Sequence, residues 1–349
     1  MVYIEIWKYS FLLAIDVLLA VDGGATKTEA IVYDGEIKGA GVSGPGNYHN
    51  VGLKAAGENT AHAITEAFQM AGCEWKDIDR AFYGFAGVES SRTSRSNVEN
   101  MLEGVHRHGT MKLYNDGVAA YYLATLGENG VVAAAGTGSV VQAGDGKKHV
   151  RVGGWGWFLG DEGSAYYIGR RGLQAATQSF DGRSGHTTLI SALERELNSE
   201  FPEAIAHFQE NPSVNNVAAF APVVTEEAAK GDDTSRKICA EAGSDLALAV
   251  RAAVERLELK GGYVIGAVGG VFRGGSVITD VFKENLSGCA GTLAPIYYGY
   301  HVVVGAVLME RHEKGDAVSA ELAQKLVSQL EGKMRGIPLE ERHRFLFLK

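Results

Sequence analysis

The chain has 349 residues, 46% of them hydrophobic and 21% charged, which leaves room for two globular domains of ordinary composition. Its formal net charge of −9 at pH 7 argues against a nucleic-acid-binding surface, because such surfaces are basic. Its three cysteines, Cys73, Cys239 and Cys289, form neither a CxxC pair nor a zinc-binding spacing, so we expect a protein of the reducing cytoplasm.

Residues 1–17 stand apart from the rest of the chain. Residues 9–21 are mostly apolar, but Asp16 interrupts them and they fall short of the roughly 20 apolar residues of a membrane helix. No small-residue cleavage site of a signal peptide precedes Asp22. We therefore expect no membrane anchor and treat residues 1–17 as an extension.

The first third of the chain predicts a mixed α/β unit. Apolar and alternating runs predict strands at residues 18–21, 29–33, 37–43, 81–85 and 111–115. Helical spacing of apolar residues predicts helices at residues 51–72, 93–103 and 117–126. The first two strands flank a tight polar turn, so the unit opens with a β-hairpin.

The same pattern restarts near residue 130. Residues 131–135 and 140–143 predict a second β-hairpin whose tip again contains glycine and threonine. This internal similarity indicates two related domains that face one another, at residues 18–126 and 127–301. Further on we expect helical stretches that include residues 226–256, a strand at 263–268, and a helix at 302–312 that crosses back, so that residues 302–349 join the first domain. The amphipathic helix at 319–333 is expected to be a solvated appendage.

The first hairpin turn is a candidate phosphate-binding loop. It reads Asp22-Gly23-Gly24-Ala25-Thr26-Lys27-Thr28. A glycine-rich turn between strands directs several unpaired N–H groups toward one point, which suits an anion. The threonines and the lysine add donors, and Asp22 offers a carboxylate for a phosphate-bound Mg²⁺. Neither a P-loop nor a GxGxxG fingerprint is present, and a plain structural hairpin is the alternative.

Two further features strengthen this interpretation. The second hairpin turn, Gly136-Thr137-Gly138-Ser139, could hold the other side of a triphosphate, although alone it could be a structural turn. Asp116 follows a predicted strand and precedes a predicted helix. There it could cap the helix, or it could accept the proton of a hydroxyl group that receives a phosphoryl group.

Residues 153–165, GGWGWFLGDEGSA, combine aromatic rings, glycines and two adjacent acids. This composition suits a carbohydrate site, because rings pack on the apolar faces of sugars and carboxylates accept hydrogen bonds from hydroxyl groups. The alternative is a loop whose tryptophans fill a core and whose acids begin a helix. Asn47, in the loop 44–50, could face the same cleft or form an Asx-turn.

Taken in order, five segments resemble the motifs of a known family. They are AVDGGATKTEA, YNDGVAA, AAGTGSVV, GGWGWFLGDEGSAYYIGRRGL and AVGGVFRGG, and the likeness spans residues 18–312. The chain resembles the N-acetylglucosamine kinase-like proteins grouped with the BadF/BadG/BcrA/BcrD ATPases, within the actin-like ATPase superfamily. SGPGNYHNVG resembles in particular the archaeal broad-specificity hexokinases of this family.

The resemblance implies an α/β protein in which two actin-like (ribonuclease H-like) domains flank a cleft. It implies an ATP-dependent kinase that phosphorylates a hydroxyl group, at C6, of a hexose or (N-acetyl)hexosamine, with Mg²⁺ near Asp22. ATP would contact Asp22, Gly23, Gly24, Thr26, Lys27, Thr28, Thr137, Gly138, Gly231, Gly270 and Gly274. Asp116 would be the catalytic base and a sugar ligand, and the other sugar ligands would be Asn47, Ser139, Trp155, Asp161 and Ala165. We also expect a homodimer.

Relatives of the same fold leave an alternative function open. Activators of 2-hydroxyacyl-CoA dehydratases resemble redox ATPases that hold an iron–sulfur cluster with cysteines at a dimer interface. The three cysteines here lack that arrangement, and an activator would have no use for residues 153–165. A sugar sensor without turnover is a second alternative, against which Asp116 argues, because a sensor needs no base.

Overall fold

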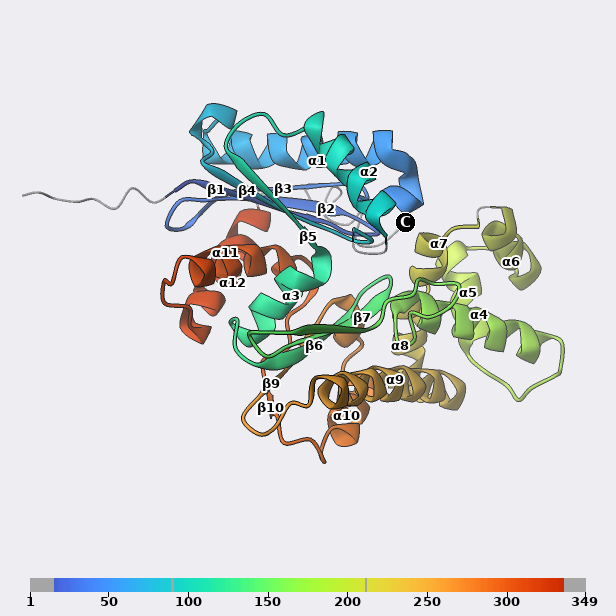
Figure 1. Ribbon diagram of the computed structural model, residues 1–349. Coiled ribbons are helices and arrows are strands. Elements are labelled where there is room, and N and C mark those ends of the chain that lie inside the picture. The colour runs from blue at the N-terminus through green and yellow to red at the C-terminus, as the bar shows by residue number, and fades with distance from the viewer. Residues whose placement is uncertain (1–15, 89–90, 211, 336–349) are drawn as a thin grey trace, which may run out of the picture.

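Two five-stranded sheets form the framework of the protein (Figure 1). The computed structural model describes residues 16–88, 91–210 and 212–335. Residues 1–15 of the predicted extension and residues 336–349 of the predicted joining segment lie outside this range. We call each sheet with the helices on its outer face a lobe.

The two sheets share one connectivity. The N-terminal sheet has the order β3-β2-β1-β4-β5, with β1 (Leu18–Gly23), β2 (Thr28–Tyr33), β3 (Ile37–Ser43), β4 (Arg80–Phe85) and β5 (Thr110–Asn115). The C-terminal sheet has the order β10-β9-β6-β7-β8, with β6 (Gly130–Ala135), β7 (Ser139–Gly144), β8 (His149–Gly153), β9 (Val264–Val268) and β10 (Thr292–Leu293). In each sheet three antiparallel strands are followed by two parallel ones. The duplicated α/β plan expected from the sequence is confirmed.

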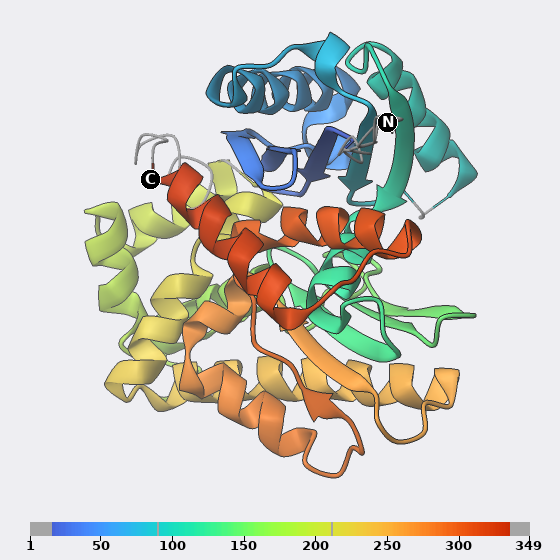
Figure 2. The same ribbon diagram turned by 90° about the vertical axis from the view of Figure 1, so that its left-hand side faces the viewer.

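Helices fill the space between the sheets and cover both outer faces (Figures 1 and 2). The outer face of the N-terminal sheet is covered by α1 (Tyr48–Ala71) and α2 (Arg92–Glu103). Between the sheets lie α3 (Asp116–Thr125), α11 (Val304–Glu313) and α12 (Ala320–Met334). The outer face of the C-terminal sheet is covered by α9 (Asp233–Leu257) and α10 (Ser276–Asn285). A lateral group of helices extends this lobe, namely α4 (Ala165–Phe180), α5 (Leu189–Leu197), α6 (Phe201–Glu210), α7 (Val214–Ala218) and α8 (Ala221–Lys230).

The strands are apolar on both faces because both faces are covered. In β1, Leu18 and Ala20 belong to the central apolar cluster with α11 and α12, whereas Leu19 and Val21 pack against α1. The central cluster also contains Val132 of the C-terminal sheet. One continuous core therefore joins the two lobes, and the predicted boundary between residues 126 and 127, which falls between α3 and β6, stays a prediction.

The expectation that residues 319–333 form a solvated appendage is wrong. The helix is there, but its apolar stripe, including Leu326 and Leu330, is buried in the central cluster. The backbone N–H of Ile37 also donates to Gln329 Oε1 over 3.1 Å. The preceding helix α11 packs against α3 and β1, and the assignment of residues 302–349 to the first domain stays a prediction.

Two smaller details differ from the sequence prediction. Gly231, with a φ of 110°, ends α8 and divides the expected helical stretch 226–256 into α8 and α9. The edge strand β8 was not expected, because it is short and runs directly into a glycine pair. None of the helices in the described ranges is long and apolar enough to cross a bilayer.

Candidate active site

Asp22 and Asp116 meet where the parallel strands of the N-terminal sheet end. Asp22 is the penultimate residue of β1 and is paired with Gly84 of β4, while Asp116 follows directly on β5. A Cβ atom at Gly84 would lie 3.6 Å from Asp116 Cα and 3.9 Å from Asp22 Oδ1. The two acids therefore surround one residue that has no side chain.

The cap of α3 is Asn115 rather than Asp116. Asn115 has an extended backbone, and its Oδ1 accepts a hydrogen bond from the N–H of Gly117 over 3.0 Å. Asp116 is the first helical residue, and its Oδ1 accepts from the same N–H over 2.9 Å. Because a neighbouring side chain already caps the helix, capping does not account for a carboxylate at position 116.

Asp22 carries an unsatisfied buried oxygen. Its Oδ1 atom has no hydrogen-bond partner among the described residues. Burial, followed by the nearby charges of Glu29 and Asp116, raises the pKa of Asp22 well above the usual range. A carboxylate in this state suits a hard cation. No group of three metal-ligating side chains occurs in the described residues.

The first hairpin tip is built by backbone contacts. The N–H of Gly24 donates to Lys27 O over 2.9 Å, and the O atom of Gly24 accepts from the N–H groups of Gly46 and Asn47 over 3.1 and 3.0 Å. The ammonium group of Lys27 lies 2.5 Å from Glu29 Oε1. The loop that contains Asn47 is thereby fixed against the hairpin.

Two adjacent glycines of this tip have different surroundings. A Cβ atom at Gly23 would lie 2.2 Å from the Phe85 ring, so packing alone excludes a side chain there. A Cβ atom at Gly24 would meet only Lys27 O, at 3.3 Å. In the second hairpin, Gly136 has no atom within 4 Å of such a Cβ position. The space beside Gly24 and Gly136 is open to a ligand.

The second hairpin tip is attached to the start of α4. The N–H groups of Ala165 and Tyr166 donate to the O atoms of Gly136 and Thr137 over 2.9 and 3.2 Å. Ser139 Oγ donates to Glu162 O over 2.7 Å. Of the predicted sugar ligands, Ser139 belongs to this turn, and Ala165 is bonded to the turn through its backbone N–H.

The two hairpin tips touch one another. The side-chain hydroxyl groups of Thr26 and Thr137 share a hydrogen bond between the lobes. Beside it, Asn215 Nδ2, from α7 in the C-terminal lobe, donates to Ala25 O over 3.3 Å. The Asn215 contact could not be predicted, because a single asparagine in a short helix belongs to no motif.

Asp161 lies directly beneath the second tip. A Cβ atom at Gly138 would lie 2.7 Å from Asp161 Oδ2. Burial raises the pKa of Asp161 to about 6, against the opposing effect of hydrogen bonds from the backbone of Ser139 and Gly156. Asp161 is also one of the few non-glycine residues with a positive φ, 60°. The segment 153–165 and the second hairpin therefore form one unit.

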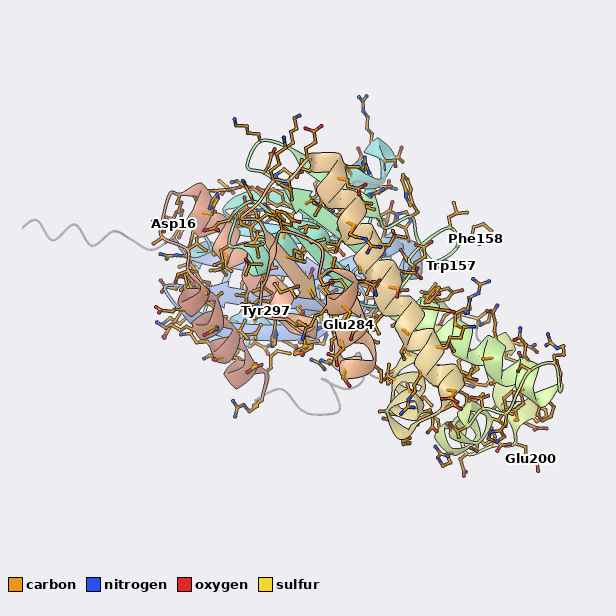
Figure 3. The ribbon with its side chains drawn as sticks, turned by 90° about the horizontal axis from the view of Figure 1, so that it is seen from below. Asp16, Trp157, Phe158, Glu200, Glu284 and Tyr297 are labelled. Atoms are coloured by element: carbon orange, nitrogen blue, oxygen red, sulfur yellow. The ribbon has the colours of Figure 1, made fainter. Side chains whose placement is uncertain are left out.

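The aromatic residues of this segment are exposed. Trp155 and Phe158 are 70% and 77% exposed, so the alternative in which the tryptophans fill a core is wrong. Figure 3 shows Trp157 and Phe158 projecting outward from their loop. The guanidinium group of Arg151 lies 4.9 Å from the centroid of the Trp155 ring. Exposed rings beside a polar turn offer a surface to a ligand with an apolar face.

The remaining predicted ligands lie either near the end of α8 or at the start of α1. Gly270 and Gly274 bound the 3₁₀ turn η2 (Gly270–Gly274), and a Cβ atom at Gly274 would lie 2.9 Å from Thr225 of α8. Gly231 ends the same helix α8. Asn47 caps α1, since its Oδ1 accepts from the N–H of His49 over 3.0 Å, so it makes the Asx-type contact that was the alternative to a place in the cleft. Its role as a sugar ligand stays a prediction.

Comparison with known sequences identifies the family. The sequence model of the BadF/BadG/BcrA/BcrD ATPase family matches residues 19–309. The chain belongs to this family. It is 27% identical over 302 residues to an N-acetylmuramic acid/N-acetylglucosamine kinase of Clostridium acetobutylicum, covering 85% of this chain and 98% of that protein. It is also 27% identical over 259 residues to an N-acetyl-D-glucosamine kinase of Dictyostelium discoideum, covering 70% and 81% of the two chains.

Solved structures place this family member in the actin-like ATPase fold. A Chromobacterium violaceum protein described as an N-acetylglucosamine kinase candidate superposes with a TM-score of 0.68 at 23% identity, covering 85% of this chain and 99% of that chain. A ROK family glucokinase of Streptomyces griseus, solved with glucose and AMPPNP, superposes with a TM-score of 0.53 at 16% identity, covering 85% and 99%. The expected two-lobed actin-like fold is confirmed.

Proposed function

We propose that the protein is an ATP-dependent sugar kinase that transfers the γ-phosphoryl group of ATP to a hydroxyl group, at C6, of a hexose or (N-acetyl)hexosamine. The observation that carries the proposal is the meeting of the two hairpin tips, at Thr26 and Thr137, beside the carboxylate pair Asp22 and Asp116. Phosphoryl transfer needs a phosphate cradle, charge neutralisation and a base, and little other chemistry. The sugar kinases named among the relatives support the same reaction class.

In this proposal the two tips hold the triphosphate between them. Phosphate oxygens approach the backbone at Gly24 and Gly136, where no side chain is in the way. The remaining phosphate-loop contacts come from Asp22, Gly23, Thr26, Lys27, Thr28, Thr137 and Gly138. Gly231, Gly270 and Gly274, which lie at the end of α8 and in η2, border the nucleoside. Asp22 holds Mg²⁺, which would neutralise charge on the phosphates when bound.

Asp116 is the proposed general base. It accepts the proton of the acceptor hydroxyl as the oxygen forms its bond to phosphorus, and the leaving group is ADP. Rigid placement at the first turn of α3 fixes the carboxylate relative to the end of β1. Asn47, Ser139, Trp155, Asp161 and Ala165 are the proposed further contacts to the sugar.

The activator alternative receives no support from the cysteines. Cys239 belongs to α9 and is fully buried in the core of the C-terminal lobe, while Cys73 and Cys289 pack against the cores of different lobes. A buried thiol cannot ligate a cluster at a subunit interface. We further propose a cytoplasmic homodimer.

A coupled ADP-release assay tests the function. Glucose, mannose, glucosamine, N-acetylglucosamine and N-acetylmannosamine are each added to the enzyme with Mg-ATP, and the phosphorylated carbon is located by ³¹P–¹H NMR. We expect sugar-dependent ADP release and a 6-phosphate product. An ATPase rate that is the same with and without every sugar would contradict the kinase and favour the activator.

A further inference from the structure

Arg151 faces the same space as the proposed catalytic base. In the antiparallel pair β7–β8, Arg151 lies directly opposite Gln142, and directly opposed residues place their side chains on the same face of a sheet. The side chain of Gln142 points at α3, because a Cβ atom at Gly117 would lie 2.9 Å from Gln142 Cγ. Arg151 is therefore the next side chain outward from the start of α3, where Asp116 lies.

The guanidinium group of Arg151 has an aromatic partner but no acidic one. It stacks over the exposed ring of Trp155 at 4.9 Å from the centroid. Among the described residues, no carboxylate oxygen lies within 4.0 Å of the Arg151 nitrogens. An arginine that is held by a ring and not neutralised presents a planar set of donors to an anion.

The position of Arg151 separates it from the phosphate cradle. Gly153 pairs with Val140 just inside the second hairpin tip, and Arg151 lies two residues further along β8. At the rise of a strand, two residues place its backbone about 7 Å further from the tip. Because Gln142, opposite Arg151, faces the start of α3, an anion bound by Arg151 would lie on the side of Asp116 and hence of the acceptor.

We propose that Arg151 and Trp155 form a specificity subsite for an anionic substituent, a carboxylate, on the acceptor sugar. The ring of Trp155 packs against an apolar part of the sugar, and the guanidinium group binds the carboxylate through two parallel N–H···O bonds. This inference rests on the proposed kinase function and adds acidic hexosamine derivatives to its acceptors. A neutral sugar binds without using Arg151.

A purely structural role for Arg151 is the alternative. A charged residue on an edge strand discourages pairing with another chain, and the stack on Trp155 could serve only to fix the loop. A structural role predicts that replacing Arg151 affects all acceptors equally. The specificity subsite predicts a change in the ratio between acidic and neutral acceptors.

The test compares N-acetylmuramic acid, which carries a carboxylate, with the neutral N-acetylglucosamine. Values of kcat/KM for both sugars are measured with the wild type, Arg151→Met and Arg151→Lys. We expect Arg151→Met to lower kcat/KM for the acidic sugar about 10- to 100-fold, the range for hydrogen bonds to charged groups, and to change the neutral sugar less than about twofold. Arg151→Lys should lie between, because it keeps the charge and loses the planar fork.

Arg256→Met is the matched control. Arg256 comes from α9 and donates from Nη1 to the backbone O atom of Arg151 over 2.9 Å, so its loss removes a nearby cation. We expect an unchanged ratio of acidic to neutral acceptor. The subsite would be overturned if Arg151→Met lowered kcat/KM equally for both sugars. It would also be overturned if the wild-type enzyme phosphorylated the neutral sugar but not the acidic one. Either result would leave the kinase proposal standing. Turnover of neither of these sugars, with glucose or mannose phosphorylated, would overturn the subsite alone, and turnover of no sugar at all would overturn both proposals.

Discussion

The side-chain hydroxyl groups of Thr26 and Thr137 share a hydrogen bond, although 111 residues separate them in the sequence. Each hydroxyl belongs to the tip of a hairpin from a different lobe. Phosphate oxygens are stronger hydrogen-bond acceptors than a threonine hydroxyl group. A triphosphate that enters between the tips would therefore take both hydroxyl donors in place of this direct bond.

Replacing these threonines should weaken ATP binding. Thr26→Val and Thr137→Val keep the shape of the side chain and remove the hydroxyl group, so each should raise the Kd of ATP about 5- to 10-fold, the equivalent of about 1 kcal/mol. Isothermal calorimetry measures the effect. The double variant should lose less binding free energy for ATP than the two single variants together, because the two residues act on one ligand. Threonine-to-serine variants are the controls, and full ATP affinity in either valine variant would contradict the role.

Asp116→Asn should separate catalysis from stability. Asn115 caps α3, so the substitution leaves the cap in place and removes only the proton acceptor. We expect kcat to fall about 10²- to 10⁴-fold, the usual contribution of a general base, with the melting temperature nearly unchanged. Asn115→Ala is the converse control, because it removes the cap and keeps the carboxylate, and it should lower the free energy of unfolding by about 1 kcal/mol. Wild-type kcat in a folded Asp116→Asn enzyme would remove the proposed base.

Gly23 and Gly24 should respond differently to one added methyl group. Gly23→Ala drives its Cβ atom to 2.2 Å from the Phe85 ring, so we expect a stability loss of about 1–3 kcal/mol in urea unfolding. Gly24→Ala leaves the fold intact, because its Cβ atom meets only one backbone oxygen at 3.3 Å. Its effect should appear as weaker ATP binding with sugar binding unchanged. Lost sugar affinity with ATP affinity kept would mean that the two sites are reversed.

Asp161 should make stability depend on pH. Its folded-state pKa of about 6 lies above the unfolded value, so its contribution is present below about pH 4 and is lost as the pH rises through about 6. Relative to Asp161→Asn, the wild type should therefore lose up to about 3 kcal/mol of unfolding free energy between these limits, at about 1.4 kcal/mol per pKa unit. Urea unfolding at several pH values measures this difference.

A neighbouring acid provides the control for Asp161. Glu162 is exposed, and its charge is the smallest of the effects on the pKa of Asp161, so Glu162→Gln should keep most of the pH dependence of the wild type. A parallel pH profile for the wild type and Asp161→Asn would show that the Asp161 carboxyl group titrates normally.

Much of the fold could be predicted from local patterns. The strands of both hairpins and the helices α2 and α3 have nearly the expected bounds, because apolar runs, turn glycines and helical spacing are short-range signals. The packing of α12 against the inner face of the N-terminal sheet could not be predicted. An amphipathic stripe shows that a helix buries one face, but it carries no information on which distant surface receives that face.

In the candidate site, too, contiguous motifs could be predicted and contacts between distant segments could not. The two glycine-rich tips were visible because their residues are contiguous, and the duplicated topology places them opposite one another. The Thr26–Thr137 contact, the cap at Asn115 and the Asn215 side chain at Ala25 depend on distances of a few ångströms between segments far apart in the sequence. Charge, propensity and periodicity do not determine such distances.

The position of α11 and α12 governs the order in which a newly made chain can complete its structure. All five strands of the N-terminal sheet leave the ribosome before residue 116, yet the inner face of that sheet, with Leu18 and Ile31, packs against helices that begin at residue 304. Through most of synthesis α3 alone is available to cover part of this apolar face, and apolar surface left exposed in this way promotes aggregation. The first lobe made is therefore the last to be finished, and truncation before residue 304 would leave it with an open core.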